Sequence, residues 1–283
     1  MTLACWYAKE LNFGDLLTPW LIETWTGAAP HNLMHAYRGW SLWKHDFRQP
    51  ESVLALRQRL APSKQPEHVM VGSILGWGTW HDDVQVVWGT GFVSENTELL
   101  NRPRELRAVR GELTLAKLPR GWQSEVAALG DPGVLIGDMV ETLPRVPGRI
   151  GFVPHYIHKK DPVVAEASDS SKVHVIDIQQ GVEAFIKELS TCETVVASAM
   201  HGIICADGLG IPTRWVKIGE PGLPAGGLFK FHDYFSAAGN GQDWPDKVSC
   251  VADILRSADS AISRDVSPLK ASLLDAAPFQ QMS

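Results

Sequence analysis

Short apolar runs alternate along this chain with stretches in which apolar residues recur at helical intervals. Residues 15–26 show the helical interval most clearly, and Gly27 follows at a position suited to end a helix. The same interval predicts helices over 181–189, 201–209 and 248–256. Short apolar runs predict strands over 68–75, 84–88, 106–109, 149–153, 173–178, 194–197 and 213–218.

This alternation of strands and helices predicts an α/β fold with parallel sheets covered on both faces. Prolines and glycine cluster over 141–149, which argues against a helix or a central strand and predicts a linker between two doubly wound halves. The predicted organisation is a first domain over 1–145, a second over 149–265 and a frayed tail over 266–283. Ligands of such folds bind at the carboxyl ends of the strands, here in the cleft between the halves.

Composition narrows the class of protein. The chain has 283 residues, 45% of them hydrophobic and 20% charged, which is the balance of a globular protein, and its formal charge of -6 disfavours a general nucleic-acid binder. The first ten residues lack the basic and apolar regions of a secretory signal, and no apolar run approaches the ~18–20 residues of a spanning helix. We therefore expect a cytoplasmic protein.

Cysteine and tryptophan each suggest one further point. The four cysteines are scattered, form no CxxC pair and give no spacing for structural zinc, so we expect free thiols. Most of the eleven tryptophans are expected to pack in the core. Four of them lie among Gly, His and Ser and are better candidates for a glycan groove, where an indole stacks on a sugar: Trp40, Trp43, Trp77 and Trp80.

Gly14 and Asp15 stand at the start of the first predicted helix, after Asn12 and Phe13. Glycine permits a tight turn and a close approach of a ligand to the backbone. Asp15 either caps the helix or, at a domain cleft, accepts a proton from a sugar hydroxyl. The sequence leaves both roles open.

Several loops after predicted strands carry glycines or charged residues. Gly72 with Ser73, and Gly89 with Gly91, can expose backbone N–H groups to an anion or a sugar. Neither loop matches a GxGxxG motif or a P-loop, which argues against a standard NAD site or Walker ATPase. Arg110 ends a strand before a helix, while Asp131 precedes a proline and is expected to form a structural turn.

Residues 197–210 carry the most information about chemistry. A strand is predicted to end near Ser198 and a helix to begin two or three residues later, which places His201 at the helix N-terminus and facing the cleft. A histidine there is either a satisfied structural residue or a functional one, and its position at a strand end favours the functional role. The adjacent Gly202 leaves room for a ligand.

Six motifs in this order resemble the polysaccharide pyruvyl transferase family, and most closely its succinoglycan-biosynthesis branch. The resemblance runs from about residue 3 to residue 235. The motifs are Asn12-Phe13-Gly14-Asp15, Gly72-Ser73-Ile74-Leu75, Gly89-Thr90-Gly91, Val109-Arg110-Gly111, Gly130-Asp131-Pro132 and Ser198-Ala199-Met200-His201-Gly202.

The resemblance implies two Rossmann-like halves arranged as in GT-B glycosyltransferases, with the acceptor side first and the donor side second. It implies transfer of a pyruvyl group from phosphoenolpyruvate to two hydroxyls of a sugar, giving a pyruvate ketal and phosphate. The family's catalytic histidine maps to His201 and a lysine that follows it to Lys217. Two donor-binding arginines of the family are replaced here by Ala199 and His155.

The predicted catalytic residues are therefore His201 and Asp15, with no metal and no cofactor besides phosphoenolpyruvate as donor substrate. The acceptor would be a glycan or lipid-linked oligosaccharide, the latter implying peripheral contact with the inner membrane, and no nucleic acid is expected. Two alternatives stay open: a GT-B type nucleotide-sugar glycosyltransferase and a non-catalytic glycan-binding homologue. The predicted substrate-binding residues are Lys217, His155, Ser198, Gly202, Gly14, Gly72, Ser73, Gly89, Gly91 and Arg110.

Overall fold

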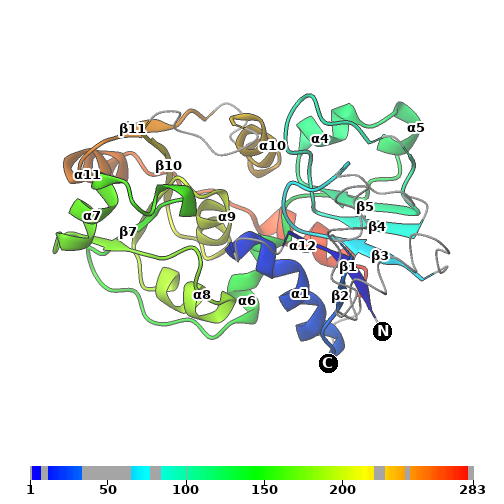
Figure 1. The fold of residues 1–283 in the computed structure, drawn as a ribbon, viewed down its shortest axis with the longest axis horizontal. Helices are drawn as coiled ribbons and strands as arrows, with labels where there is room; N and C mark the ends of the chain where they lie inside the picture. Colours follow the sequence, from blue (N-terminus) through cyan, green and yellow to red (C-terminus); the bar gives the residue numbers. More distant parts are fainter. Residues whose placement is uncertain are drawn as a thin grey trace, which may run out of the picture.

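The computed structural model describes residues 2–7, 12–33, 65–76, 84–99, 101–219, 227–239 and 243–279. Figure 1 shows two parallel sheets side by side, one in each half of the molecule. The first sheet has the order β2-β1-β3-β4-β5-β6, and all its strand pairs are parallel. Its strands are β1 (Leu3–Cys5), β2 (His31–Asn32), β3 (Glu67–Val69), β4 (Gln85–Trp88), β5 (Glu105–Val109) and β6 (Ala128–Leu129).

The second sheet is also parallel and has the order β11-β10-β9-β7-β8. Its strands are β7 (Ile150–Val153), β8 (Val173–Val175), β9 (Thr194–Ala197), β10 (Thr213–Ile218) and β11 (Asp246–Val248). Two parallel sheets within an α/β fold confirm the predicted class. The residues 141–149 form neither helix nor strand before β7, as expected of the segment that joins the two sheets.

Helices connect the strands and cover the sheets. The first predicted helix is α1, and Gly27 ends it in the left-handed conformation at φ 68°, as its position in the sequence predicts. The helix predicted over 248–256 starts later than expected, because residues 246–248 form the edge strand β11. The α-helices are α1 (Phe13–Thr26), α4 (Glu112–Lys117), α5 (Arg120–Gln123), α6 (Ile136–Met139), α7 (Pro162–Asp169), α8 (Val182–Ser190), α9 (Met200–Gly208), α10 (Phe229–Ala238), α11 (Val251–Asp259) and α12 (Ser267–Asp275), and the 3-10 turns are η3 (Pro132–Leu135) and η4 (Tyr156–His158).

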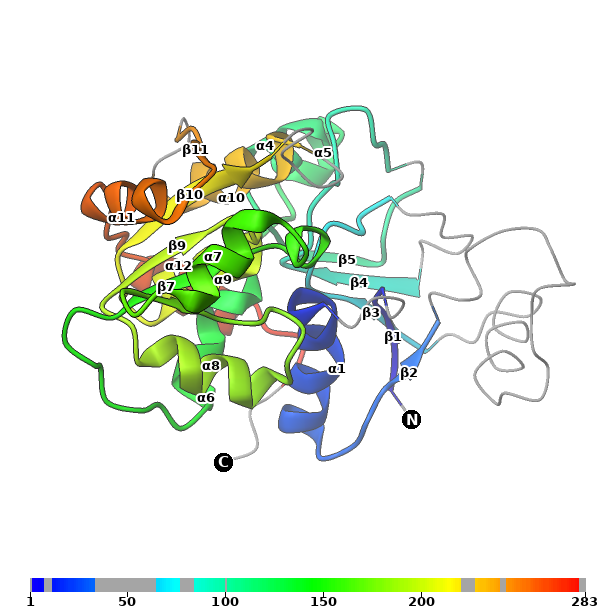
Figure 2. The ribbon, with the colours of Figure 1, turned by 60° about the vertical axis from the view of Figure 1, so that its left-hand side comes forward.

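One hydrophobic core lies between the two sheets and is shared by both halves. Successive strand residues point to opposite faces, so Val195 and Ala197 of β9 enter this central core while Val196 enters the outer core of the second half. In the first sheet, Trp88 faces the central core and Val87 the opposite one. The turned view in Figure 2 shows α1 and α9 between the two sheets, where their apolar side chains fill this shared core.

The C-terminal segment is a helix rather than the tail predicted over 266–283. Helix α12 packs against β6 and η3, elements of the first half, and its Leu273 is fully buried. The indole Nε1 of Trp88 donates a hydrogen bond to the Leu273 carbonyl at 3.0 Å. Leu269 and Leu273, one helical turn apart, supply the apolar face that orders this segment.

Helix α10 joins the two halves through a buried ion pair. Arg110, at the end of β5, donates from Nε to Asp233 of α10 at 2.9 Å, and both side chains are fully buried. Thr114 donates to the same carboxylate from its backbone N and its hydroxyl, both at 2.7 Å. On its other side α10 belongs to the second half, where Phe231 stacks on Trp215 of β10 with ring centroids 4.4 Å apart.

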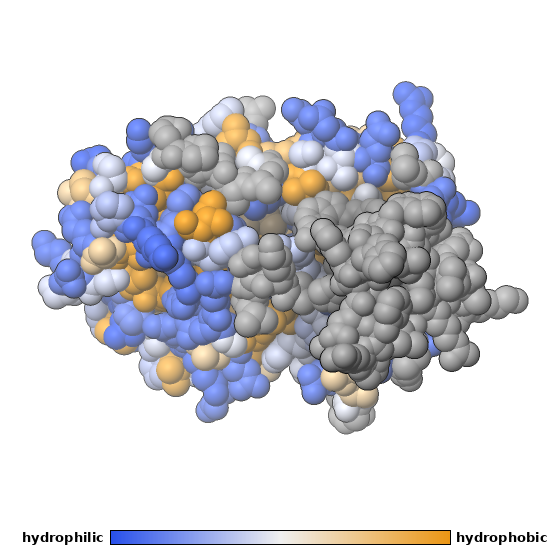
Figure 3. Space-filling model, viewed as in Figure 1, coloured by the Kyte–Doolittle hydropathy of each residue, from blue (hydrophilic) through white to orange (hydrophobic). Residues whose placement is uncertain are grey.

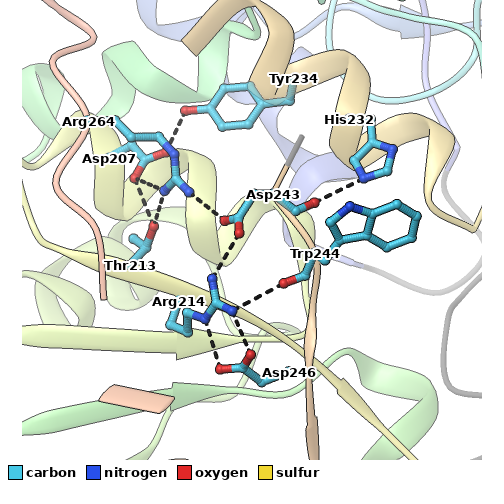
Figure 4. Close-up of polar contacts among 9 residues, drawn as sticks. All are labelled: Asp207, Thr213, Arg214, His232, Tyr234, Asp243, Trp244, Asp246 and Arg264. Carbon is cyan, nitrogen blue, oxygen red and sulfur yellow. Dashed lines mark hydrogen bonds and ion pairs between the residues drawn. The ribbon is translucent and has the colours of Figure 1, made fainter. Parts of the chain in front are cut away.

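A second polar network fixes α10 and the C-terminal segment to the second sheet (Figure 4). Asp207 of α9 accepts hydrogen bonds from Tyr234 at 2.9 Å and Thr213 at 3.0 Å, and it pairs with the buried Arg264 at 3.3 Å. Arg264 also reaches Asp243, which in turn pairs with Arg214 of β10. Arg214 further pairs with Asp246, so its guanidinium is engaged in ion pairs within the second half.

The face of the second half that Figure 3 shows is mostly polar. On the face in Figure 3, hydrophilic residues cover most of the left side, and hydrophobic residues form small separate groups. Among the described residues, no helix is both long enough and apolar enough to cross a bilayer.

The Arg110–Asp233 pair predicts a large stability loss when its charge balance is broken. Asp233→Asn leaves the guanidinium buried without a carboxylate, which costs about 3–5 kcal/mol of unfolding free energy. The matched control is Glu125→Gln, which neutralises the exposed Arg102–Glu125 pair and should cost less than ~1 kcal/mol. Urea unfolding followed by tryptophan fluorescence measures both, and equal losses would contradict a special role for the buried pair.

Candidate active site

A cleft of about 440 Å³ lies where the carboxyl ends of strands from both halves meet. The structure brings five of the predicted site residues together in its lining: Asp15, Gly72, Ser73, His155 and His201. A larger hollow, about 800 Å³, runs along β8 and the linker and contains none of the predicted site residues. The smaller cleft is therefore the candidate active site.

His201 lies in the first turn of α9, directly after β9, and only 8% of it is exposed. Its ring packs against the backbone of Gly14 in α1, so closely that a Cβ at that position would overlap the imidazole. A glycine is required here because of this close approach between the two halves.

Helix α1 is held in place by the second half as well as the first. The backbone N of Phe13 donates to the carbonyl of Ile178 at 3.0 Å, and the Phe13 ring packs on Phe185 of α8 with ring centroids 4.3 Å apart. These contacts bring Asp15, two residues further along α1, to the wall of the cleft beside His201.

Asp15 and Lys230 have shifted ionisation in the cleft. Burial raises the pKa of Asp15 to about 6, although the charges of His201 and Lys230 and a hydrogen bond from Asn12 oppose this shift. Burial lowers the pKa of Lys230 to about 8, Arg110 adds to the lowering, and Asp15 opposes it. A carboxylate and an ammonium with these values can each exchange a proton near neutral pH.

His155 does not supply the positive charge expected of it. Burial, with the nearby charges of Lys230, His158 and His201, lowers its pKa to about 3, so the ring is neutral near pH 7. Its Nδ1 accepts a hydrogen bond from the backbone N of Ile157 at 3.4 Å, which leaves Nε2–H as the donor of this tautomer. His155 can therefore donate a hydrogen bond to a ligand, but it cannot act as a cation.

The wall from the first half is a loop held by buried hydrogen bonds. Arg110 donates to the hydroxyl of Ser73 at 2.5 Å and to the carbonyl of Phe92 at 2.7 Å. Thr90 donates to the carbonyl of Gly72 at 2.9 Å. Arg110 thus orders the loop that lines the cleft, and its own guanidinium is fully buried.

Other predicted residues lie outside the cleft lining. Ser198 is buried and accepts a hydrogen bond from the backbone N of His155 at 2.9 Å. Lys217 is half-buried on β10 beside β11. The tryptophans proposed for a glycan groove, Trp40, Trp43, Trp77 and Trp80, fall outside the described residues. The glycines that serve close packing instead of lining the cleft are Gly14, Gly89, Gly91 and Gly202.

Lys230 is the cleft residue that the sequence analysis missed. It stands in the first turn of α10, a helix that was not predicted. Phe231, Phe235 and Ala238 recur at helical intervals there, and Gly239 ends the helix in the left-handed conformation, so the pattern was present in the sequence. Among the described residues, no group of three or more His, Cys, Asp or Glu side chains is placed to hold a metal ion.

Comparisons with known proteins relate the chain to one family and to two curated proteins. Residues 86–219 match the sequence profile of the family described as polysaccharide pyruvyl transferase. The uncharacterized protein L143 of Acanthamoeba polyphaga mimivirus is 33% identical over 186 residues, which cover 63% of this chain and 62% of that protein. The succinoglycan biosynthesis protein ExoV of Rhizobium meliloti (strain 1021) is 28% identical over 224 residues, or 75% of this chain and 58% of that protein.

The chain thus spans about six-tenths of the length of these curated relatives. No solved structure matches the chain significantly. The matched profile covers β4 to β10 and so includes both Arg110 and His201. Over residues 86–219, the chain is therefore similar to the polysaccharide pyruvyl transferase family.

Proposed function

We propose that this protein transfers the pyruvyl group of phosphoenolpyruvate to two hydroxyls of a sugar in an exopolysaccharide or its lipid-linked precursor, with release of phosphate. The observation that carries the proposal is the meeting of His201, Asp15 and Lys230 in one cleft. Together they offer a proton donor, a proton acceptor and a cation for an anionic donor. The match to the profile of that family supports pyruvyl transfer as the type of reaction.

Lys230 is the residue that we assign to the donor anion. It is the lysine in the lining of the cleft, which also contains Ala199 at the position where the family has an arginine. The first turn of α9 forms the same wall, and the N-terminus of a helix favours a negative charge. His155 adds a neutral N–H donor. These groups would hold the phosphate and carboxylate in the absence of the arginine.

The reaction requires one proton to reach carbon and two acceptor protons to leave. His201 gives a proton to C3 of the enol, and the positive charge that develops at C2 accepts the first sugar hydroxyl. The Asp15 carboxylate takes the proton of that hydroxyl, which its pKa of about 6 allows at neutral pH. The bond from C2 to the phosphate oxygen then breaks, and the second hydroxyl closes the ketal as its proton leaves with phosphate.

The larger arrangement follows from the same assignment. We place the acceptor on the side of the first half and the donor on the side of the second, as in GT-B glycosyltransferases. A lipid-linked acceptor would bring the protein into peripheral contact with the inner membrane.

A donor and acceptor screen tests the function. The protein is incubated with phosphoenolpyruvate and candidate glycans, and we expect phosphate release together with the mass of an added pyruvyl ketal. His201→Asn, which keeps a polar side chain but cannot act as an acid, should lower the rate by about 100-fold to 10,000-fold. Transfer from a nucleotide sugar instead would establish a glycosyltransferase, and glycan binding without turnover would establish a binding protein.

The donor lysine can be identified by comparing Lys230→Ala with Lys217→Ala. The Lys230 ammonium is present below about pH 8 and is lost as the pH rises through that value, so phosphoenolpyruvate should bind more weakly at alkaline pH. We expect Lys230→Ala to weaken binding about tenfold or more near neutral pH and to remove this pH dependence. Calorimetry measures both, and an effect confined to Lys217→Ala would assign the anion to β10.

Gly14→Ala should reduce turnover by displacing His201. The added methyl group overlaps the imidazole, so the ring must move away from the cleft. We expect a loss of turnover of about tenfold or more, since small displacements of a catalytic group are costly. Gly121→Ala is the control, because a Cβ there meets open space. Unchanged turnover in Gly14→Ala would show that the close approach is not needed.

A further inference from the structure

Two buried polar atoms face each other behind the cleft. Nε2 of His201 lies 3.7 Å from Oδ2 of Asp131, and the Asp131 side chain is fully buried. Neither atom has a hydrogen-bond partner among the residues that the structure describes. Buried polar atoms are nearly always paired, so two such atoms at this separation point to an interaction between them.

Only half of the Asp131 carboxylate is explained by its local turn. Oδ1 accepts a hydrogen bond from the backbone N of Gly133 at 2.9 Å and caps the turn η3. Oδ2 contributes nothing to this cap and lies on the side of the His201 ring. An asparagine or a serine could form this cap equally well. The cap therefore does not explain why a second, buried carboxylate oxygen, Oδ2, is present.

The His201 ring also packs against α1. Cε1 and Nδ1 are the ring atoms nearest to Gly14, whereas Nε2 is buried toward Asp131. The charged and titratable groups around the ring are Asp131 from η3, Asp15 from α1 and His155 after β7. With Nε2 buried, Nδ1 is the ring nitrogen left to serve the cleft.

We propose that Asp131 is a positioning residue that accepts the Nε2–H of His201 and thereby makes Nδ1 the atom that carries the transferred proton. The catalytic part of this inference rests on the proposed function. In the proton transfer, the Nδ1–H bond breaks and the bond to C3 of the donor forms, while the Nε2–H bond to Asp131 persists. The carboxylate also stabilises the imidazolium, which the N-terminus of α9 would otherwise disfavour.

The ring tautomer of His201 in the wild-type protein is the first test. Long-range proton–nitrogen NMR spectra of protein labelled at its ten histidines distinguish Nε2–H from Nδ1–H, and the His201→Gln protein identifies the signal by its loss. At a pH where the ring is neutral, we expect Nε2–H. A ring protonated at Nδ1 would overturn the proposal, and this measurement needs no Asp131 variant to fold.

Asp131→Asn and a matched control complete the test. The asparagine keeps an oxygen for the Gly133 cap but presents an N–H to Nε2, so the tautomer should reverse to Nδ1–H. Asp161→Asn is the control, because Asp161 also precedes a proline and caps the next helix through Val163 at 3.1 Å. It should leave the His201 signals unchanged.

These spectra need neither donor nor acceptor, so they test the positioning of His201 even if pyruvyl transfer is not the reaction. Where transfer is observed, Asp131→Asn should lower kcat by about 100-fold or more with little change in the donor KM. An unchanged tautomer in Asp131→Asn would overturn the proposal. So would a loss of kcat that Asp161→Asn shares.

Discussion

The buried pair between Arg110 and Asp233 is the constraint on which the cleft depends. It fastens α10, a helix packed on the second half through Trp215, to the end of β5 in the first half. The same guanidinium orders the Ser73 loop. The Arg110 guanidinium therefore positions both walls of the cleft. A buried pair adds little stability relative to apolar residues of the same volume, but it accepts only a narrow geometry. Its value here is the placement of Lys230 and Ser73.

The chemistry of the cleft follows from burial combined with charges of opposite sign. Burial penalises the charge of each side chain, so it raises the pKa of Asp15 and lowers the pKa of Lys230, both toward neutral pH. Burial also lowers the pKa of His155, so its ring is neutral near pH 7. An anionic donor entering the cleft would bring charge that Lys230 and His201 compensate. Under the proposed function, binding of this anion would compensate the burial of the Lys230 ammonium.

Much of the fold was readable in the sequence. The strands β9 and β10 were predicted residue for residue, since their apolar runs are short and sharply bounded. Helix α12 was missed because its apolar face is narrow and follows charged and turn-forming residues. The meeting of Asp15 with His201 could be expected, since both were predicted at helix N-termini facing the cleft between the halves. Lys230 could not, because its place depends on where Asp233 is buried, which no local pattern encodes.

Helix α12 follows the second half in the sequence but packs against the first half. It covers Trp88 of β4 and packs on β6, and both strands are synthesised well before it. The first half leaves the ribosome before α12 is synthesised. An apolar face of the first sheet is therefore exposed to solvent while the second half is being synthesised. Domains usually fold as they emerge. A chain that stops before α12 would leave this face of the first half exposed and prone to association.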